Sequence, residues 1–206
     1  MSEPSRRTLV LVAHPALPLS KPDRALVDVA ETMDDVTVRD LYSRYQSHPI
    51  NVPAERALAA AADDIVVHFP VLHHHEPPLL QQWMQRVFDP AWYMASGADV
   101  LYSGTGLRVT TVVEDSGSSP AVRRLQRWRV EEQSLFLKQW AHRLGMLWRA
   151  PAVLPVPPHA GSVELESLQQ TYRHVLTAAD DAAGDPARRQ GRPLRPIERT
   201  VSDATR

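Results

Sequence analysis

The sequence predicts an α/β fold in which a five-stranded parallel sheet carries helices on both faces. Short apolar runs rich in β-branched residues recur along the chain, and amphipathic helical segments separate them. The connections between the two kinds of segment are short. Strands that alternate with helices in this way form a parallel sheet with right-handed connections, covered on both faces. The predicted fold class is therefore doubly wound α/β.

The first half of the chain contains three predicted strands. The run at residues 8–13 is apolar and β-branched, and Pro15 follows it closely, as expected for a buried parallel strand. The next segment, residues 23–33, has the apolar spacing of a helix, with Ser20 or Asp23 as its cap. Three further segments complete this half: a strand at residues 36–39, an Ala-rich helix at residues 53–62 and a strand at residues 65–69.

The second half opens with the clearest amphipathic helix, residues 79–88, where glutamines and an arginine separate apolar side chains at helical spacing. A strand is expected at residues 107–113, followed by a long helical pattern through residues 125–144. Residues 152–156 form the fifth predicted strand, and residues 163–179 the closing helix.

A single domain at residues 8–182 is expected. The chain has 206 residues, which suits one hydrophobic core. Residues 1–7 are expected to be a flexible N-terminus. Residues 183–206, rich in proline and arginine and poor in apolar side chains, are expected to be a flexible tail. The basic tail could meet a membrane surface or an acidic partner, but a solvated appendix is the favoured interpretation.

Composition argues against several function classes. The formal net charge of -1 argues against a nucleic-acid partner. The chain has no cysteine, which excludes disulfides, thiolate metal sites and a cysteine nucleophile. No apolar run reaches the roughly 18 residues that a membrane span requires, and the N-terminal start is too short for a signal-peptide core. A cytoplasmic location is expected.

Ligand-binding residues are expected in the loops after the strands, because open parallel sheets bind ligands beyond their carboxyl ends. The first such loop places Ser20 before a helix start, where free N–H groups and the helix dipole can hold a phosphate. Helix capping by Ser20 and Asp23 explains the same spacing equally well. The loop lacks the glycine pattern of a P-loop, so nucleotide hydrolysis has no support.

The loop after the third strand is dense in histidine. Consecutive residues in an extended loop point in different directions, so they rarely converge on one ion, and no dedicated metal site is expected. A ligand pocket in which one imidazole titrates near neutrality is the favoured interpretation. A histidine-containing metal-binding protein remains the third and weakest function hypothesis. The residues concerned are His68, His73, His74, His75 and Glu76.

Three stretches carry a resemblance to a known family. They are VAHP at residues 12–15 with Ser20, the segment from Phe69 through the PPLLQQW run ending at Trp83, and VFDPAW at residues 87–92. These stretches resemble the flavodoxin-like NAD(P)H:quinone oxidoreductases, which include DT-diaphorases and the ancillary subunits of glutathione-gated potassium efflux systems. The similarity runs from about residue 8 to residue 155.

The resemblance implies a flavodoxin-like fold and a homodimer that binds FMN or FAD. It implies hydride transfer from NAD(P)H to the flavin and then to a quinone or similar two-electron acceptor. A peripheral contact with a membrane transport protein follows by the same analogy. Aromatic residues such as Trp92, Tyr93 and Trp128 are expected at the dimer interface.

No catalytic residue is assigned. The residues that match the family's cofactor loops are His14, Ser20 and Asp23 on the phosphate side, Leu72, His73 and His74 along the isoalloxazine edge, and Asp115, Ser116, Gly117 and Ser118 in the loop that is usually Thr-Thr-Gly-Gly.

The sequence departs from the family pattern at these loops. Asp23 stands where an asparagine is usual, and His73 where an aromatic is usual. Glu114 and Asp115 add carboxylates near an anionic cofactor, and like charges repel. The alternative function is therefore a flavodoxin-like regulatory or binding subunit that has lost tight flavin binding. The arginines at 123, 124, 127 and 129 are expected to form a solvated helix face rather than a nicotinamide phosphate grip.

Overall fold

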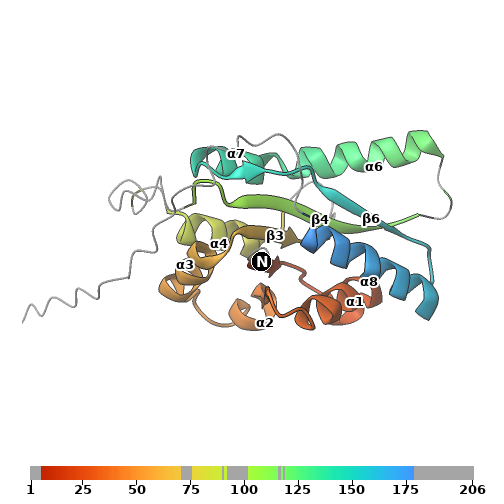
Figure 1. Ribbon diagram of the computed structural model, residues 1–206, viewed down its shortest axis with the longest axis horizontal. Coiled ribbons are helices and arrows are strands. Elements are labelled where there is room, and N and C mark those ends of the chain that lie inside the picture. Colours follow the sequence, from red (N-terminus) through yellow and green to blue (C-terminus); the bar gives the residue numbers. More distant parts are fainter. Residues whose placement is uncertain are drawn as a thin grey trace, which may run out of the picture.

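The computed structural model describes residues 6–70, 76–89, 91, 102–115, 117 and 119–178. At its centre lies a parallel sheet in the order β2-β1-β3-β4-β5, with β6 also paired to β4 (Figure 1). The strands are β1 (Thr8–Val12), β2 (Val36–Asp40), β3 (Asp64–His68), β4 (Gly106–Glu114), β5 (Leu147–Trp148) and β6 (Ala152–Val156). The helices are the short 3-10 helix η1 (Leu17–Leu19), α1 (Lys21–Glu31), α2 (Leu41–Tyr45), α3 (Val52–Ala61), α4 (Pro78–Val87), α6 (Pro120–Gln133), α7 (Leu135–Arg143) and α8 (Ser162–Thr177). The predicted doubly wound α/β fold is confirmed.

Both faces of the sheet are covered, because the side chains of β1 alternate between two cores. Leu9 and Leu11 lie in a core shared with α3, α4 and α7. Val10 and Val12 lie in a second core shared with α1 and α8. Every residue of β1 is buried, as a central parallel strand requires.

The fifth strand position is divided into two short strands. β5 pairs with the start of β4 at Gly106, and β6 pairs with the later part of β4 from Thr110 onward. Pro151 lies between β5 and β6, and proline cannot donate to a strand ladder. The sequence predicted one strand at residues 152–156, and the structure adds a two-residue strand before it.

Gly106 leaves room for an ion pair at this break. The Nε of Arg149 lies 3.1 Å from Oδ1 of Asp64. A Cβ at position 106 would lie 2.0 Å from that oxygen and 2.5 Å from the Arg149 Nε. The pair ties the region between β5 and β6 to the first residue of β3.

Two local differences from the sequence prediction have clear physical causes. The pattern at residues 125–144 forms two helices, α6 and α7, that meet at the buried Ser134, whose hydroxyl donates to the carbonyl of Val130 at 2.5 Å. The helix α2 was not predicted, because its five residues are too few for a periodic pattern. Its start is capped by Asp40, whose Oδ1 accepts from the Ser43 N–H at 3.1 Å.

The ordered elements run from Thr8 to Thr177, inside the domain expected at residues 8–182. Among the helices of the described ranges, none has both the length and the apolar character needed to cross a bilayer.

Candidate functional site

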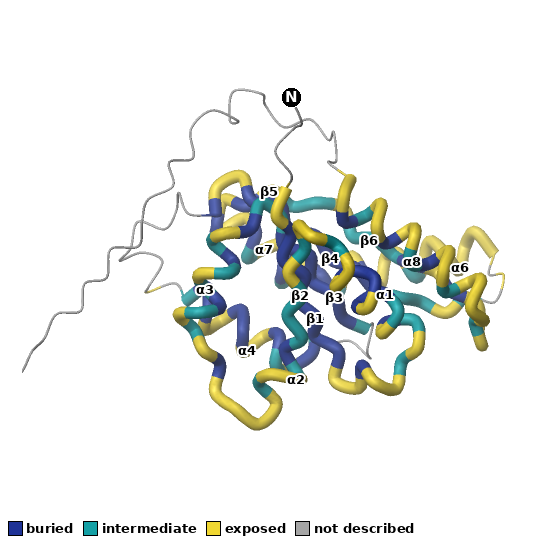
Figure 2. The backbone as a smooth tube through the Cα atoms, turned by 60° about the horizontal axis from the view of Figure 1, so that its bottom comes forward, coloured by how far each residue is buried: buried dark blue, intermediate teal, exposed yellow. Residues whose placement is uncertain are grey.

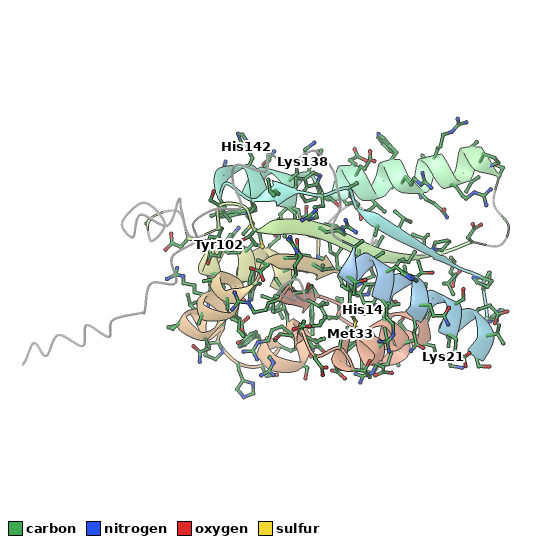
Figure 3. All side chains as sticks on the ribbon, viewed as in Figure 1. His14, Lys21, Met33, Tyr102, Lys138 and His142 are labelled. Atoms are coloured by element: carbon green, nitrogen blue, oxygen red, sulfur yellow. The ribbon has the colours of Figure 1, made fainter. Side chains whose placement is uncertain are left out.

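The strand order places a candidate ligand site beside the carboxyl ends of β1 and β3. The chain moves outward from β1 to β2 on one side and from β3 to β4 on the other. Open sheets with this order, such as that of flavodoxin, bind their ligand at this switch point. The two loops start side by side, since the Ala13 N–H donates to the His68 carbonyl at 2.8 Å. Figure 3 labels His14 and Lys21, which lie near the two ends of the loop from β1 to α1.

A buried polar cluster lies under this loop, with the carboxylate of Asp23 at its centre. Oδ1 of Asp23 lies 2.9 Å from Nε2 of His68. Oδ2 accepts from the hydroxyl of Ser20 and lies 3.5 Å from Nε2 of His14. The side chain of Asp23 is 8% exposed and that of His68 is 1% exposed, so this charge is almost removed from water.

The cluster extends across the sheet to α8. Nδ1 of His68 lies 3.0 Å from the hydroxyl oxygen of Thr110, on β4. The Tyr172 hydroxyl forms a hydrogen bond with Thr110, and the His68 and Tyr172 ring centroids are 6.1 Å apart. Burial, together with the charge of Asp23, raises the pKa of Tyr172 far above its usual range, so this hydroxyl stays protonated.

Hydrogen-bond directions fix the protonation of the groups around Asp23. The Ala16 N–H donates to Nδ1 of His14 at 3.1 Å, so that nitrogen is unprotonated and His14 is neutral with its proton on Nε2. Burial raises the pKa of Asp23, but hydrogen bonds from His14 and His68, the charge of His68 and the Ser20 hydroxyl outweigh it. The pKa of Asp23 therefore lies well below its ordinary value of 3.8, and Asp23 is ionised.

The loop from β1 to α1 has few backbone donors left for a ligand. Ser20 is the N-cap of α1, and its oxygen accepts from the Asp23 N–H at 3.4 Å. The N–H groups of Leu17, Leu19 and Ser20 donate to carbonyls within the loop. Three positions of the loop and helix start, Pro15, Pro18 and Pro22, have no N–H. The Lys21 N–H makes no hydrogen bond in the described part of the structure, which leaves it available at the positive end of α1.

The loop after β4 lies farther along the sheet. His68 is level with Thr110, and β4 continues to Glu114 beside β6. Asp115 thus follows Thr110 by five residues, roughly 16 Å along an extended strand. Its carboxylate lies 3.6 Å from the guanidinium of Arg123, which offsets part of its charge. Gly117 has a φ of +85°, a backbone conformation that favours glycine.

The structure therefore brings some of the predicted site residues together and separates others. His14, Ser20 and Asp23 form one cluster at the ends of β1 and β3. Asp115 and Gly117 belong to a second position beyond β4. The other predicted residues, Leu72, His73, His74, Ser116 and Ser118, lie outside the described residues.

Sequence reasoning missed three members of the buried cluster. His68 was named only within the histidine group of the loop after the third strand, as a possible metal ligand or pocket residue and without a link to Asp23, and Thr110 and Tyr172 were not singled out. One signal for His68 was available: it ends an otherwise apolar strand pattern, at a position on the same face as Val66. Across the described ranges, no three His, Asp or Glu side chains gather in a group that could hold a metal ion.

The fold and site together define a doubly wound α/β protein with a buried polar cluster at the β1/β3 switch point. The sequence matches, over residues 6–176, a family described by its flavodoxin-like fold. The chain belongs to this flavodoxin-like family.

Three proteins illustrate what the chain is similar to. The uncharacterized NAD(P)H oxidoreductase YdeQ of Bacillus subtilis is 39% identical over 95 residues, 46% of this chain and 48% of YdeQ. KefG, the ancillary protein of the glutathione-regulated potassium-efflux system of Escherichia coli, is 28% identical over 172 residues, 84% of this chain and 92% of KefG. General stress protein 14 of Treponema denticola, solved in complex with FMN, has a TM-score of 0.65 and a sequence identity of 24%. The match covers 82% of this chain and 95% of the Treponema denticola chain.

The extent of these matches differs. The aligned region spans about half the length of two curated Bacillus subtilis relatives, 48% of YdeQ and 55% of its general stress protein 14. At 24% identity, the Treponema denticola structure is evidence for the fold alone.

Proposed function

We propose that this chain is a flavin-dependent NAD(P)H oxidoreductase that reduces quinones or similar two-electron acceptors. The observation that carries the proposal is the family match over residues 6–176, which spans the elements that build the switch-point site. The NAD(P)H oxidoreductase name of YdeQ supports the reaction class, and the flavodoxin-like family of the chain supports a flavin as the cofactor. A cytoplasmic location is part of this proposal.

The residues at the switch point fit the phosphate end of such a cofactor. The Lys21 N–H and the positive end of α1 are suited to an anion. The flavin, when bound, supplies the two-electron chemistry, and the protein orients it. We assign His14, Ser20 and Asp23 to the phosphate side. We assign Leu72, His73 and His74 to the ring edge, and Asp115, Ser116, Gly117 and Ser118 to the third loop.

The test is the visible absorption spectrum of the purified protein before and after incubation with FMN or FAD. We expect flavin bands that bleach on anaerobic addition of NADH or NADPH and return on addition of a quinone. A protein that stays colourless after incubation with both flavins would contradict the proposal.

We also propose that the protein is a homodimer that uses α6 as part of its interface. In α6, Val130 is the one buried residue, and Figure 2 shows this helix exposed along most of its length. Leu125 and Trp128 are 46% and 55% exposed, and Leu135 at the start of α7 is 52% exposed. An exposed apolar surface of this kind is typical of an interface.

The charges of α6 favour a second copy of the chain as the partner. Arg123 and Arg124 lie in the first half of the helix, and Glu131 and Glu132 lie in its last turn. An antiparallel pairing of two α6 helices about a two-fold axis would place this arginine pair of one copy against the glutamate pair of the other.

Sedimentation of the parent and of Trp128→Glu tests the dimer. We expect a dimer for the parent and a monomer of unchanged fold for the variant, because Trp128 contributes little to the core of its own chain. The matched control is Val163→Glu on α8, an apolar residue that is 73% exposed. Because α8 packs in the other core from α6, this change should leave the dimer intact. A parent protein that sediments as a monomer at micromolar concentration would contradict this interface.

A second candidate function is an ancillary subunit that contacts a membrane transport protein. One observation favours it: the match to KefG covers 92% of the length of that protein. Flavin binding distinguishes the two candidate functions. A subunit that acts only through contacts with a transport protein does not have to bind flavin, so its absorption spectrum should show no flavin bands.

A further inference from the structure

We infer that Asp23 is a specificity-determining residue that weakens binding of the flavin's phosphate, and that His68 is the positioning residue that holds the Asp23 carboxylate in that place. The inference rests on the proposed flavin site and concerns which end of the cofactor supplies its affinity. FMN carries a phosphate, whereas riboflavin has the same ring system without one.

Asp23 already places a negative charge at the position where an anionic ligand would benefit from α1. Its carboxylate lies at the start of the helix, within hydrogen-bond reach of Ser20. A helix N-terminus stabilises one nearby anion through its dipole, and a second anion then meets the charge of the first. The side chain of Asp23 is 8% exposed, so water screens this repulsion poorly.

The Ser20 hydroxyl is directed away from an incoming phosphate. A serine hydroxyl has one proton, and that of Ser20 is donated to Oδ2 of Asp23. The oxygen of Ser20 meanwhile accepts from the Asp23 N–H. To donate to a phosphate, Ser20 must give up its bond to a buried carboxylate, which costs more than exchanging one with water.

The side chains that face or lie near the Asp23 carboxylate are those of His14, His68 and Tyr172. His14 faces Oδ2 but is neutral, because its Nδ1 accepts from the Ala16 N–H. Tyr172, from α8, lies beyond His68 and stays protonated. His68, from β3, bonds Asp23 Oδ1 through one ring nitrogen and the Thr110 hydroxyl through the other, so hydrogen bonds on both sides of its ring hold it against the carboxylate.

His68 also fixes where the carboxylate points. Its ring lies between Thr110 on one side and Asp23 on the other, and it is fully buried. With Oδ1 bound to His68, Oδ2 faces Ser20 and His14. The Asp23–His68 pair therefore links the charge at the start of α1 to β3 and, through Thr110, to β4.

The test compares FMN with riboflavin by quenching of flavin fluorescence. In Asp23→Asn, the affinity for FMN should rise about tenfold, since one full charge near the phosphate is removed in a poorly screened site. The affinity for riboflavin should stay unchanged. His68→Gln keeps a donor to Asp23 but loses the bond to Thr110 that orients the side chain, so the carboxylate is held less firmly. Its affinity for FMN should therefore rise about threefold, again without change for riboflavin.

Asp28→Asn is the matched control, because Asp28 lies on the same helix with its side chain 51% exposed and pairs with Arg24. It should bind both flavins as the parent does. Thermal melts establish that each variant is folded, and His68→Gln tests the inference if Asp23→Asn does not fold.

The outcomes separate the inference from the proposed function. If the parent and the folded variants bind neither flavin, the proposed function and this inference are both overturned. If they bind flavin but the ratio of FMN to riboflavin affinity is the same in the parent, Asp23→Asn and His68→Gln, the inference is overturned and the proposed function stands. Inorganic phosphate should compete with FMN more strongly in Asp23→Asn than in the parent.

Discussion

At the scale of single residues, Glu55 shows how one buried carboxylate can join four elements. Its side chain is fully buried and accepts from Nε of Arg39 on β2 at 2.8 Å and from Nε1 of Trp83 on α4 at 3.0 Å. The hydroxyl of Tyr45, at the end of α2, donates to it at 2.5 Å. Because α3 carries Glu55 itself, these bonds fix β2, α2 and α4 around α3.

We expect Glu55→Gln to lower the free energy of unfolding by about 3 kcal/mol, because it leaves the guanidinium of Arg39 without its buried counter-charge. Tyr45→Phe removes a single hydrogen bond from the same carboxylate and should cost about 1 kcal/mol. Urea denaturation of the three proteins measures both values. Equal stability of Glu55→Gln and the parent would show that the ion pair contributes no net stability.

The depressed pKa of Asp23 predicts a loss of stability in acid. A carboxyl group with a lowered pKa in the folded state stabilises the fold above its ordinary value of 3.8, and this contribution is lost as the pH falls. Between about pH 5 and pH 2, the unfolding free energy should therefore fall less in Asp23→Asn than in the parent. The control is Asp28→Asn, whose exposed pair with Arg24 contributes little. Parallel curves for Asp23→Asn and the parent in this range would contradict the assignment.

The sequence revealed little of this residue-scale organisation. Ser20 and Asp23 could be predicted near a helix start, because capping residues leave a local pattern. The contacts of Asp23 with His68, and of His68 with Thr110, join residues 45 and 42 positions apart. Spacing along the chain carries no information on such contacts, since the sheet register creates them.

At the scale of elements, Arg56 attaches α3 to the end of α4. Its Nε donates to the carbonyl of Val87 at 2.8 Å, and Nη2 donates to that of Arg86 at 3.0 Å. The last carbonyls of a helix have no partner within the helix and carry its negative dipole end, so a guanidinium there is doubly favourable.

We expect Arg56→Met to lower the free energy of unfolding by about 1 to 2 kcal/mol, because methionine keeps the apolar stem but loses both hydrogen bonds. Arg44→Met on α2 is the control, since Arg44 is exposed and should change stability by less than about 0.5 kcal/mol. Denaturant titrations measure both. A larger effect at position 44 than at position 56 would contradict this account of the α3 to α4 contact.

Most elements could be predicted because each combines a periodic apolar pattern with a local signal for its start. For example, α4 begins at Pro78, directly after Pro77, and exposes glutamines between its buried apolar residues. The separation of α6 from α7 could not be predicted, because Ser134 is compatible with a helix and its break depends on burial against the core. The strand β5 is too short for a pattern of its own and exists through its pairing with β4.

At the scale of the whole molecule, the order of the strands determines where the site lies. The alternation of strands and helices predicted a parallel sheet, but alternation alone does not specify which strand lies beside which. The order β2-β1-β3-β4 brings the loops after β1 and β3 together. The general rule for open parallel sheets predicted that the loops after the strands bind a ligand, and the resemblance to flavodoxin-like proteins assigned particular residues of those loops to the cofactor.

The last prediction concerns the C-terminal boundary of the fold. Removing residues 185–206 should leave the melting temperature and flavin binding unchanged, because α8 ends at Thr177 and the removed segment has too little apolar surface to offset the entropy of ordering it. The contrasting variant removes residues 163–206 and takes with it Leu168, Tyr172 and Leu176, which fill the core against α1. That variant should not fold, and it would also remove the hydroxyl that bonds Thr110. Thermal melts followed by circular dichroism compare both with the full chain. A drop of more than about 4 °C in the shorter truncation would mean that residues after 184 stabilise the domain or its dimer, and the boundary of the folded unit would have to be moved toward the C-terminus.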